Sequence, residues 1–349
     1  MNRLPAEFYE RVCELPDGSI LLEAEKLSGI FGKYAQKVWQ QRTCYVGLVE
    51  NGVEKTGYLV YQSSRREVRS PEEIQAVPKK FVKHATIHLL DGKEENVSRA
   101  IVKRFPNALY AFIIYSPSIN EAWVDFACSL DRLHSIFIVK KLEEEAIQLF
   151  KKLVNARRLS KLQLYGEACE GGILELLKSV FCQDQFVYLR ISKPTAGPWN
   201  SAIVRTLLQH WADNSEKLDR KRLVLEGICE GGVQQLEEFL LQRASPSLPL
   251  GTTDSERSSS HPGMHSALKV CSEEECQHAG QKFTRFIKPS CVYKYEEGEG
   301  DDLRRIYISF ECANEEERRT GQKNRIASHR GHDDLSLMRA TNQIRLFFA

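Results

Sequence analysis

The 349-residue chain lacks a long apolar run, a large excess of charge of either sign, and the usual signatures of catalysis. No segment approaches the roughly 18 consecutive apolar residues of a membrane helix, so a membrane partner is unsupported. The 49 Lys and Arg residues nearly balance 47 Asp and Glu residues. The resulting net charge of +2 argues against a nucleic-acid binder and an acidic disordered tail. Residues 1–10 contain charges where a signal peptide needs an apolar run, so we expect a cytoplasmic or nuclear protein.

The ten cysteines lack the dense, regular spacing of a small secreted scaffold, so we expect reduced and mostly buried thiols. Apolar residues make up 42% of the chain and charged residues 28%, which is typical of a globular protein. One hydrophobic core stops growing at roughly 250 to 300 residues. A chain of this length therefore needs several domains or a repeat array.

Residues 1–42 predict three short helices. Pro5 suits the first helical position, and Leu4, Phe8 and Val12 then recur every four residues along one face. Later apolar residues repeat at similar spacing after a break at Asp17-Gly18 and again after Ser28-Gly29.

Residues 43–80 predict a hairpin and a connector. Two β-rich runs flank Asn51-Gly52, a dipeptide that tolerates the left-handed conformations of a tight primed turn, which places the hairpin at residues 43–62. Residues 63–80 contain Pro71 and Pro78 and predict at most one short helix.

Residues 81–243 alternate strand-like and helix-like runs. The strand candidates are Ala85–Leu90, Leu109–Tyr115, Ser135–Val139, Leu159–Leu164, Phe186–Ile191 and Leu223–Leu225. Their central residues (Ile87, Phe112, Phe137, Leu162, Leu189 and Leu223) are separated by 25, 25, 25, 27 and 34 residues. A nearly constant period of this size predicts a solenoid in which parallel strands line one curved side and helices line the other. The exposed strand side of such an array is the usual binding surface.

Two of these units match each other directly. The segment from Leu162 to Gly172 aligns with the segment from Leu223 to Gly232, and both contain Cys-Glu-Gly-Gly before apolar residues at helical spacing. We expect each unit to be one strand, one tight turn and one helix. The arrangement resembles leucine-rich repeats of a divergent kind, because Cys169 and Cys229 fall five and four positions after the last repeat Leu, and not three.

The last part of the chain predicts a loop and a β-rich tail. Residues 244–266 hold mainly Ser, Pro, Gly, Thr and charged residues, which is typical of a disordered loop. Residues 267–349 predict further sheet that closes the array, because a terminal repeat needs a polar outer surface. Strand candidates there are Ala267–Val270, Cys291–Tyr295, Arg305–Cys312 and Gln343–Phe348, and Ser272 is placed to cap a short helix.

The chain contains no phosphate-binding loop, nucleophile elbow or zinc-protease motif, so we expect no enzyme activity, no cofactor and no metal. One alternative is a zinc-stabilised module or a metal-dependent enzyme. Its candidate ligands are Cys271, Cys276, His278, Cys291 and Cys312, or His329, His332, Asp333 and Asp334. The C-x4-C spacing is at the loose end of the range for zinc, which favours buried thiols.

Basic doublets recur just before strands or at helix ends, as in Lys79-Lys80 and Arg220-Lys221-Arg222. Cations at a helix carboxyl end offset the helix dipole, which favours a structural role. The alternative is that they line one rim of the array and bind an acidic partner.

The amino-terminal segment resembles the F-box. Its pattern opens with Leu4-Pro5-Ala6-Glu7-Phe8 and closes with Leu27-Ser28-Gly29-Ile30-Phe31, and such a segment before a divergent leucine-rich array is similar to the F-box families expanded in nematodes. Asp17-Gly18 and the acidic Glu23 and Glu25 depart from the more apolar second helix of the pattern.

The resemblance implies a substrate receptor of a cullin-type ubiquitin ligase. The F-box would bind a Skp-family adaptor, and the array would bind an unknown protein target. The residues that it implies for adaptor binding are Leu4, Pro5, Phe8, Val12, Leu22, Leu27 and Phe31. The alternative is a free-standing repeat scaffold without a link to ubiquitin ligase, in which residues 1–42 only cap the array.

Overall fold

The computed structural model describes residues 5–14, 18–91, 95–195, 199, 201–244, 262–276, 290–311 and 335–349. The fold is mixed α/β, and the chain divides into two compact units. Unit 1 comprises Met1–Phe137 and Gln148–Arg158, and unit 2 comprises Ile138–Ile147 and Leu159–Ala349. In each unit the described strands form an open sheet that does not close into a barrel.

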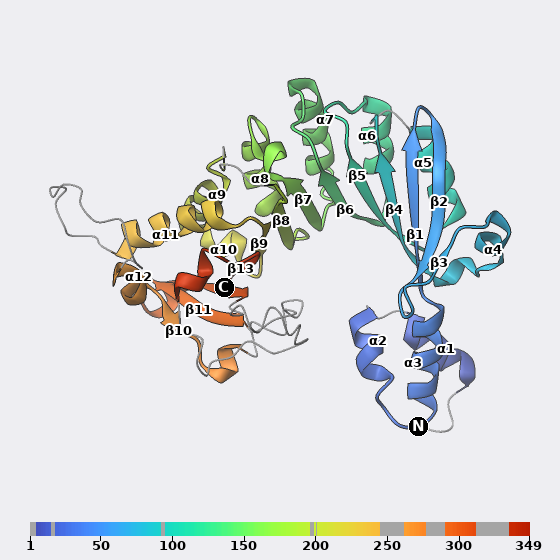
Figure 1. Ribbon diagram of the computed structural model, residues 1–349, viewed down its shortest axis with the longest axis horizontal. Helices are drawn as coiled ribbons and strands as arrows, with labels where there is room; N and C mark the ends of the chain where they lie inside the picture. Colours follow the sequence, from blue (N-terminus) through green and yellow to red (C-terminus); the bar gives the residue numbers. More distant parts are fainter. Residues whose placement is uncertain are drawn as a thin grey trace. The chain divides into compact units, whose positions relative to one another are not determined.

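Three helices precede the first strand, as the sequence predicts, and we call them the head. They are α1 (Ala6–Glu14), α2 (Gly18–Ala24) and α3 (Ile30–Gln41), drawn in dark blue (Figure 1). Their inward faces enclose a small core of their own, made of Cys13, Leu21, Ala24, Ala35 and Val38. The three helices of the head therefore pack around a hydrophobic core of their own.

The sheet of unit 1 begins with the predicted hairpin. Its strand order is β3 (Glu67–Val68), β2 (Val53–Tyr61), β1 (Thr43–Glu50), β4 (Val82–Leu89), β5 (Leu109–Ile114) and β6 (Leu133–Ile138). Strands β1 and β2 are antiparallel, and their turn has φ 50° at Asn51 and φ 72° at Gly52. Both values lie in the left-handed region that a primed turn requires, which confirms the prediction. Strand β4 pairs in parallel with β1 and with β5.

Helices follow the strands of unit 1. The connector holds α4 (Pro71–Ala76), and the strands from β4 onward are followed by α5 (Glu95–Arg104), α6 (Glu121–Cys128) and α7 (Glu144–Asn155), of which α7 begins in unit 2. Strand and helix meet through aromatic rings: Phe112 of β5 lies edge-on to Trp123 of α6, with 5.3 Å between the ring centroids. Both side chains are fully buried.

The sheet of unit 2 combines a parallel half and an antiparallel half. Its order is β7 (Lys161–Tyr165), β8 (Tyr188–Lys193), β9 (Arg222–Gly227), β13 (Gln343–Phe348), β12 (Arg304–Glu311), β11 (Ser290–Glu297) and β10 (Lys269–Val270). Strands β7, β8 and β9 are parallel, and the remaining neighbours are antiparallel. The helices are α8 (Ile173–Phe181), α9 (Ile203–Asp213), α10 (Ser215–Leu218), α11 (Glu230–Ala244) and α12 (Pro262–Ala267). Helix α10 is an extra element between β8 and β9, and it helps explain the long 34-residue step.

The last strand, β13, takes a position that the sequence did not predict. It lies between β9 and β12, so the tail extends the sheet through the end of the chain. Phe348 sits close to Phe181 of α8 and to Trp211 of α9, with ring centroids 5.7 Å and 6.0 Å away. Burial of three large rings favours this insertion.

Strands β5 and β7 alternate in burial, with one residue buried and the next half-exposed, whereas Leu223, Val224 and Leu225 of β9 are all buried. In unit 2 the buried set contains Leu189 and Leu225, and helices α8, α9 and α11 lie on one side of β7–β9 (Figure 1). One sheet face is therefore covered by helices. The other face of β7 and β8 stays half-exposed.

The paired Cys-Glu-Gly-Gly segments differ in structure. In the first copy Gly171 has φ 77° and α8 begins after it, whereas in the second copy Gly231 and Gly232 lie inside α11 and pack against Trp199. The prediction of a tight strand-to-helix turn at both glycine pairs was therefore wrong for the second copy. Trp199 lies outside any helix. Residues 245–261 of the predicted loop lie outside the described residues, and α12 begins at Pro262.

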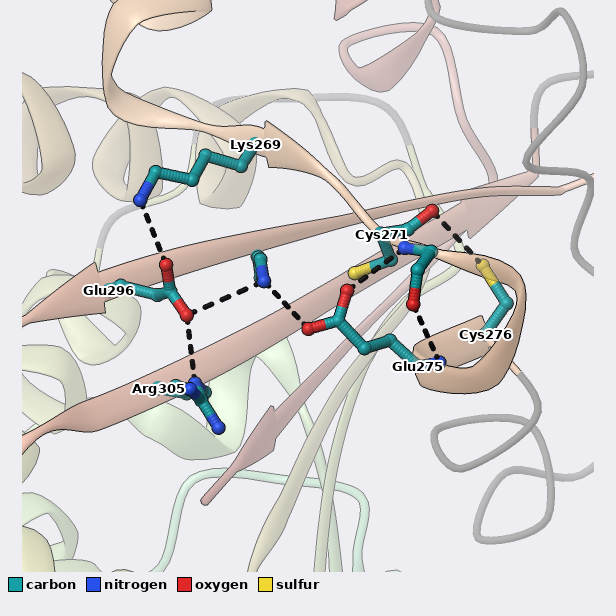
Figure 2. Close-up of polar contacts among 8 residues, drawn as sticks. Lys269, Cys271, Glu275, Cys276, Glu296 and Arg305 are labelled. Carbon is teal, nitrogen blue, oxygen red and sulfur yellow. Dashed lines mark hydrogen bonds and ion pairs between the residues drawn. The ribbon is translucent and has the colours of Figure 1, made fainter.

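A network of charges joins β10, β11 and β12. The carboxylate of Glu296 contacts Lys269 Nζ at 2.9 Å and Arg305 Nε at 2.8 Å, with Lys294 Nζ 3.5 Å away (Figure 2). Hydrogen bonds from Lys269 and Arg305 lower the pKa of Glu296 to about 2, although partial desolvation of the carboxylate acts to raise it. Lys294 also contacts Glu275, which forms the predicted capping box with Ser272.

We expect Glu296→Gln to lower the free energy of unfolding by about 1 to 2 kcal/mol at neutral pH. A carboxylate whose pKa is lower in the folded state than in the unfolded state stabilises the fold at pH values above the unfolded-state pKa. For Glu296 this stabilisation is lost as the pH falls from about 4.5 to about 2. Urea unfolding at several pH values should show the two proteins converging over that range. Glu299→Gln, an exposed change in the β11–β12 turn, is the control. A difference that persists at pH 2 would contradict the assignment.

Candidate functional site

The head carries most of the exposed large apolar side chains. Among the described residues, nine large apolar side chains are exposed, and five of them belong to the head. These five, which we call the apolar set, are between 38% and 57% exposed: Phe8, Ile20, Leu22, Leu27 and Ile30. Scattered exposed apolar residues are common on any surface, whereas five within 23 positions of the chain make the head a candidate binding surface.

The structure places the residues predicted for adaptor binding in three environments. Leu4 lies outside the described residues, and Pro5 is exposed. Phe8, Leu22 and Leu27 are members of the apolar set. The remaining two, Val12 and Phe31, are half-buried, and Phe31 packs against the core of the head. Those two side chains are placed to support the head from inside.

Two members of the apolar set, Ile20 and Ile30, were missed from sequence. The signal was present, because Ile20-Leu21-Leu22 are consecutive apolar residues on a helix. Neighbouring helical positions point about 100° apart, so a run of three spans more than one narrow core-facing stripe. In the structure Leu21 is buried and both neighbours are exposed.

Aromatic rings hold α1 against α3 within the head. The ring of Tyr9 stacks on Tyr34 with 5.8 Å between centroids, and it lies 6.4 Å from Phe31. Phe8 points away from this core and is 47% exposed. The ring of Phe8 also lies edge-on to that of Tyr9, with 6.0 Å between centroids. Substitution of Phe8 therefore removes this one ring contact and leaves the stacking of Tyr9 on Tyr34 in place.

One polar cluster in unit 2 has the residue types of a thiol protease. The Sγ atom of Cys182 lies 3.1 Å from Nε2 of His210, whose Nδ1 lies 3.3 Å from the side-chain nitrogen of Asn214. However, Cys182 follows the carboxyl end of α8, where the helix dipole disfavours a thiolate. Burial raises the pKa of Cys182 and lowers that of His210, so both groups favour their neutral forms. The arrangement does not supply an activated nucleophile.

We therefore expect Cys182 to react slowly with iodoacetamide at neutral pH. Because its pKa is raised, the thiolate fraction should grow only at alkaline pH. Mass spectrometry of the alkylated peptide over time, compared with glutathione in the same tube, measures the rate. Alkylation of Cys182 at pH 7 faster than that of glutathione would indicate an activated thiol and contradict this assignment.

The structure describes three of the residues of the zinc alternative, Cys271, Cys276 and Cys291. Cys271 and Cys276 are buried in an apolar cluster with Val292, and desolvation raises the pKa of Cys271 to about 12. Cys291 precedes Val292 on the same strand, so its side chain points to the opposite face of the sheet. The other candidates, His278, Cys312, His329, His332, Asp333 and Asp334, lie outside the described residues.

Within the described ranges, no group of three or more His, Cys, Asp or Glu side chains is arranged to hold a metal ion. No helix in these ranges has both the length and the apolar character to span a bilayer. No protein-family model matches the chain, and no curated protein matches it significantly.

Proposed function

We propose that this chain is a substrate receptor of a cullin-type ubiquitin ligase, in which the head binds a Skp-family adaptor. The observation that carries the proposal is the apolar set, because the three short helices of the head and the turn between α2 and α3 expose five large apolar side chains. The resemblance to the F-box indicates the class of partner. It is carried by Leu4-Pro5-Ala6-Glu7-Phe8 and Leu27-Ser28-Gly29-Ile30-Phe31.

We also propose that the strand–helix repeats act as a leucine-rich-repeat-like solenoid that binds the target protein. Three features support this role: neighbouring strands follow chain order in β4–β5 and in β7–β8–β9, these pairs are parallel, and helices separate them along the chain. Their half-exposed strand face is the natural docking surface.

The proposed role needs no catalytic residue in this chain. A receptor that holds a target next to a charged ubiquitin-conjugating enzyme raises the effective concentration of the reacting groups.

Recovery of the adaptor tests the proposal. A Skp-family adaptor should be recovered with the wild-type chain but not with the triple variant Leu4→Ala, Pro5→Ala, Phe8→Ala. Equal recovery with both chains, or recovery with neither, would remove the ligase assignment and leave the free-standing scaffold. Deleting residues 1–42 separates the same alternatives, because a cap is needed for folding and an adaptor-binding head is not.

A further inference from the structure

Cations gather at the edge of the unit 1 sheet where β4, β5 and β6 begin. Lys79 begins the short 3-10 helix that leads into β4, Lys103 lies in the last turn of α5 before β5, and Arg132 directly precedes β6. Arg157 follows the end of α7. Strands β4 and β5 are parallel, so their first residues share one edge of the sheet. We call Lys79, Lys103, Arg132 and Arg157 the basic rim.

Contacts between these connections make the rim one continuous surface. The N–H of Tyr110, at the start of β5, donates to the carbonyl oxygen of Arg132 at 2.9 Å. The Tyr110 hydroxyl donates to the carbonyl oxygen of Phe105 at 2.8 Å, just after α5. Burial raises the pKa of Tyr110, and the nearby Arg132 guanidinium partly offsets that rise. On the other side, Arg158 pairs with Asp131 at 3.1 Å, which places the end of α7 beside Arg132.

The four cations of the basic rim are exposed, and within the described ranges none of their side chains has a hydrogen bond or an ion pair. The neighbouring Arg104 and Arg158 differ, because Glu54 and Asp131 pair with them. The connections 77–81, 105–108, 129–132 and 156–160 contain one carboxylate, that of Asp131. The positive charge of the rim is therefore accessible and largely uncompensated.

The helix dipoles do not account for the whole rim. A cation stabilises a helix carboxyl end within its last turn, which explains Lys103 but neither Lys79 nor Arg132. Arg157 has φ 53°, in the left-handed region that Gly or Asn usually occupies after a helix. Holding another side chain there costs about 1 kcal/mol, so an arginine at this position indicates a role for its charge.

We infer that the basic rim binds an acidic segment of the target protein, through Asp or Glu side chains, and this inference rests on the proposed receptor function. Each arginine can hold a carboxylate through two N–H donors, and each lysine adds attraction without a fixed geometry. Neighbouring strands lie about 4.8 Å apart, so the rim spans about 10 Å from β4 to β6. About three residues of extended chain cover that distance.

Two other anionic partners fit the rim less well. Single-stranded nucleic acids stack their bases on exposed aromatic rings, whereas Phe81, Phe105 and Tyr110 at this edge are buried. A membrane surface binds exposed apolar side chains beside the cations. Among the described residues of unit 1 outside the head, the one exposed large apolar side chain is Val53, which pairs with Glu50 at the opposite ends of the strands.

Fluorescence anisotropy of a labelled peptide of alternating Glu and Ser residues, titrated with the full chain, tests the inference. We expect the peptide to bind more tightly than a matched peptide with Gln in place of Glu, and more weakly as salt increases. The double variant Arg132→Gln, Arg157→Asn should weaken binding about tenfold. Asparagine tolerates the left-handed backbone better than arginine, so Arg157→Asn alone should weaken binding about threefold without lowering the thermal midpoint.

The double variant Lys55→Gln, Lys140→Gln is the matched control, because it removes the same charge from exposed positions away from the rim. Lys55 lies near the start of β2, beside the hairpin turn, and Lys140 follows the carboxyl end of β6. The affinity for the Glu peptide should change less than about twofold. The inference is wrong if the Glu and Gln peptides bind equally, if the rim variant binds as well as the control, or if an oligouridylate or vesicles of phosphatidylserine bind more tightly than the Glu peptide.

Recovery of the Skp-family adaptor is measured in parallel, and the rim variant should retain it. A wild-type chain that binds the Glu peptide but recovers no adaptor would contradict the receptor function. A wild-type chain that recovers the adaptor but does not bind the peptide would contradict only the role of the basic rim.

Discussion

The double substitution Phe8→Ser, Leu27→Ser should weaken binding of a Skp-family adaptor at least about 30-fold, or about 2 kcal/mol. Both side chains are about half exposed in the head, and a partner that covers them would bury the remaining apolar surface. Serine is polar and short, so it removes this apolar contact with the partner. Isothermal titration of purified adaptor into the full chain measures the change.

The same experiment includes a matched control within unit 1. Val53→Ser also replaces an exposed apolar residue, on β2 outside the head, and should change the affinity less than twofold. Leu21→Ser, by contrast, introduces a hydroxyl into the core of the head and should lower helicity measured by circular dichroism. Full affinity in the Phe8, Leu27 double variant would show that the adaptor, if it binds, does not use the apolar set.

The strands of the parallel regions could be predicted because their signal is local. Runs such as Leu109–Ile114 alternate buried and half-exposed residues and are rich in β-branched and aromatic side chains. The hairpin turn was equally local, since Asn51-Gly52 alone favours it. The insertion of β13 beside β9 was not predictable in this way, because it depends on contacts of Phe348 with rings more than 130 residues away in the chain.

The basic doublets show both a success and a limit of sequence reasoning. Lys221 donates to the carbonyl oxygens of Gln183 and Phe186, just after α8, as expected for a cation near a helix carboxyl end. Its neighbour Arg222 begins β9 and lies opposite Tyr188 of β8. A doublet is a single feature in the sequence, but in the structure its two side chains have different surroundings and roles.

The head was predicted in outline for a similar reason. Periodicity gave three helices, but it could not say which apolar residues face inward, because that depends on how the helices pack. Phe31 matches the F-box pattern and is nevertheless half-buried against the internal core, whereas Ile30 beside it is 43% exposed. Candidate binding residues taken from a pattern therefore mix surface residues with supporting ones.

Gly227→Ala should lower the free energy of unfolding by about 3 kcal/mol, the largest stability effect that we expect from so small a change. Gly227 ends β9 with φ 90°, in the left-handed region that side chains disfavour. A Cβ atom there would overlap the backbone carbonyl oxygen of Lys193, which already accepts a hydrogen bond from Ile228 N–H at 2.8 Å. Backbone atoms of β8 would have to move, and the strand pairing around Lys193 would weaken.

The equivalent glycine of the first repeat provides the matched control. Gly166 aligns with Gly227 in the paired segments and also lies beside Lys193, but its φ is not positive and a Cβ atom would make an ordinary 3.8 Å contact with the Lys193 side chain. Gly166→Ala should therefore change stability by less than about 0.5 kcal/mol. Urea unfolding of both variants measures the difference. A larger loss of stability for Gly227→Ala than for Gly166→Ala would show that glycine is required where the backbone of β9 approaches that of β8. Equal losses for the two variants would contradict this explanation.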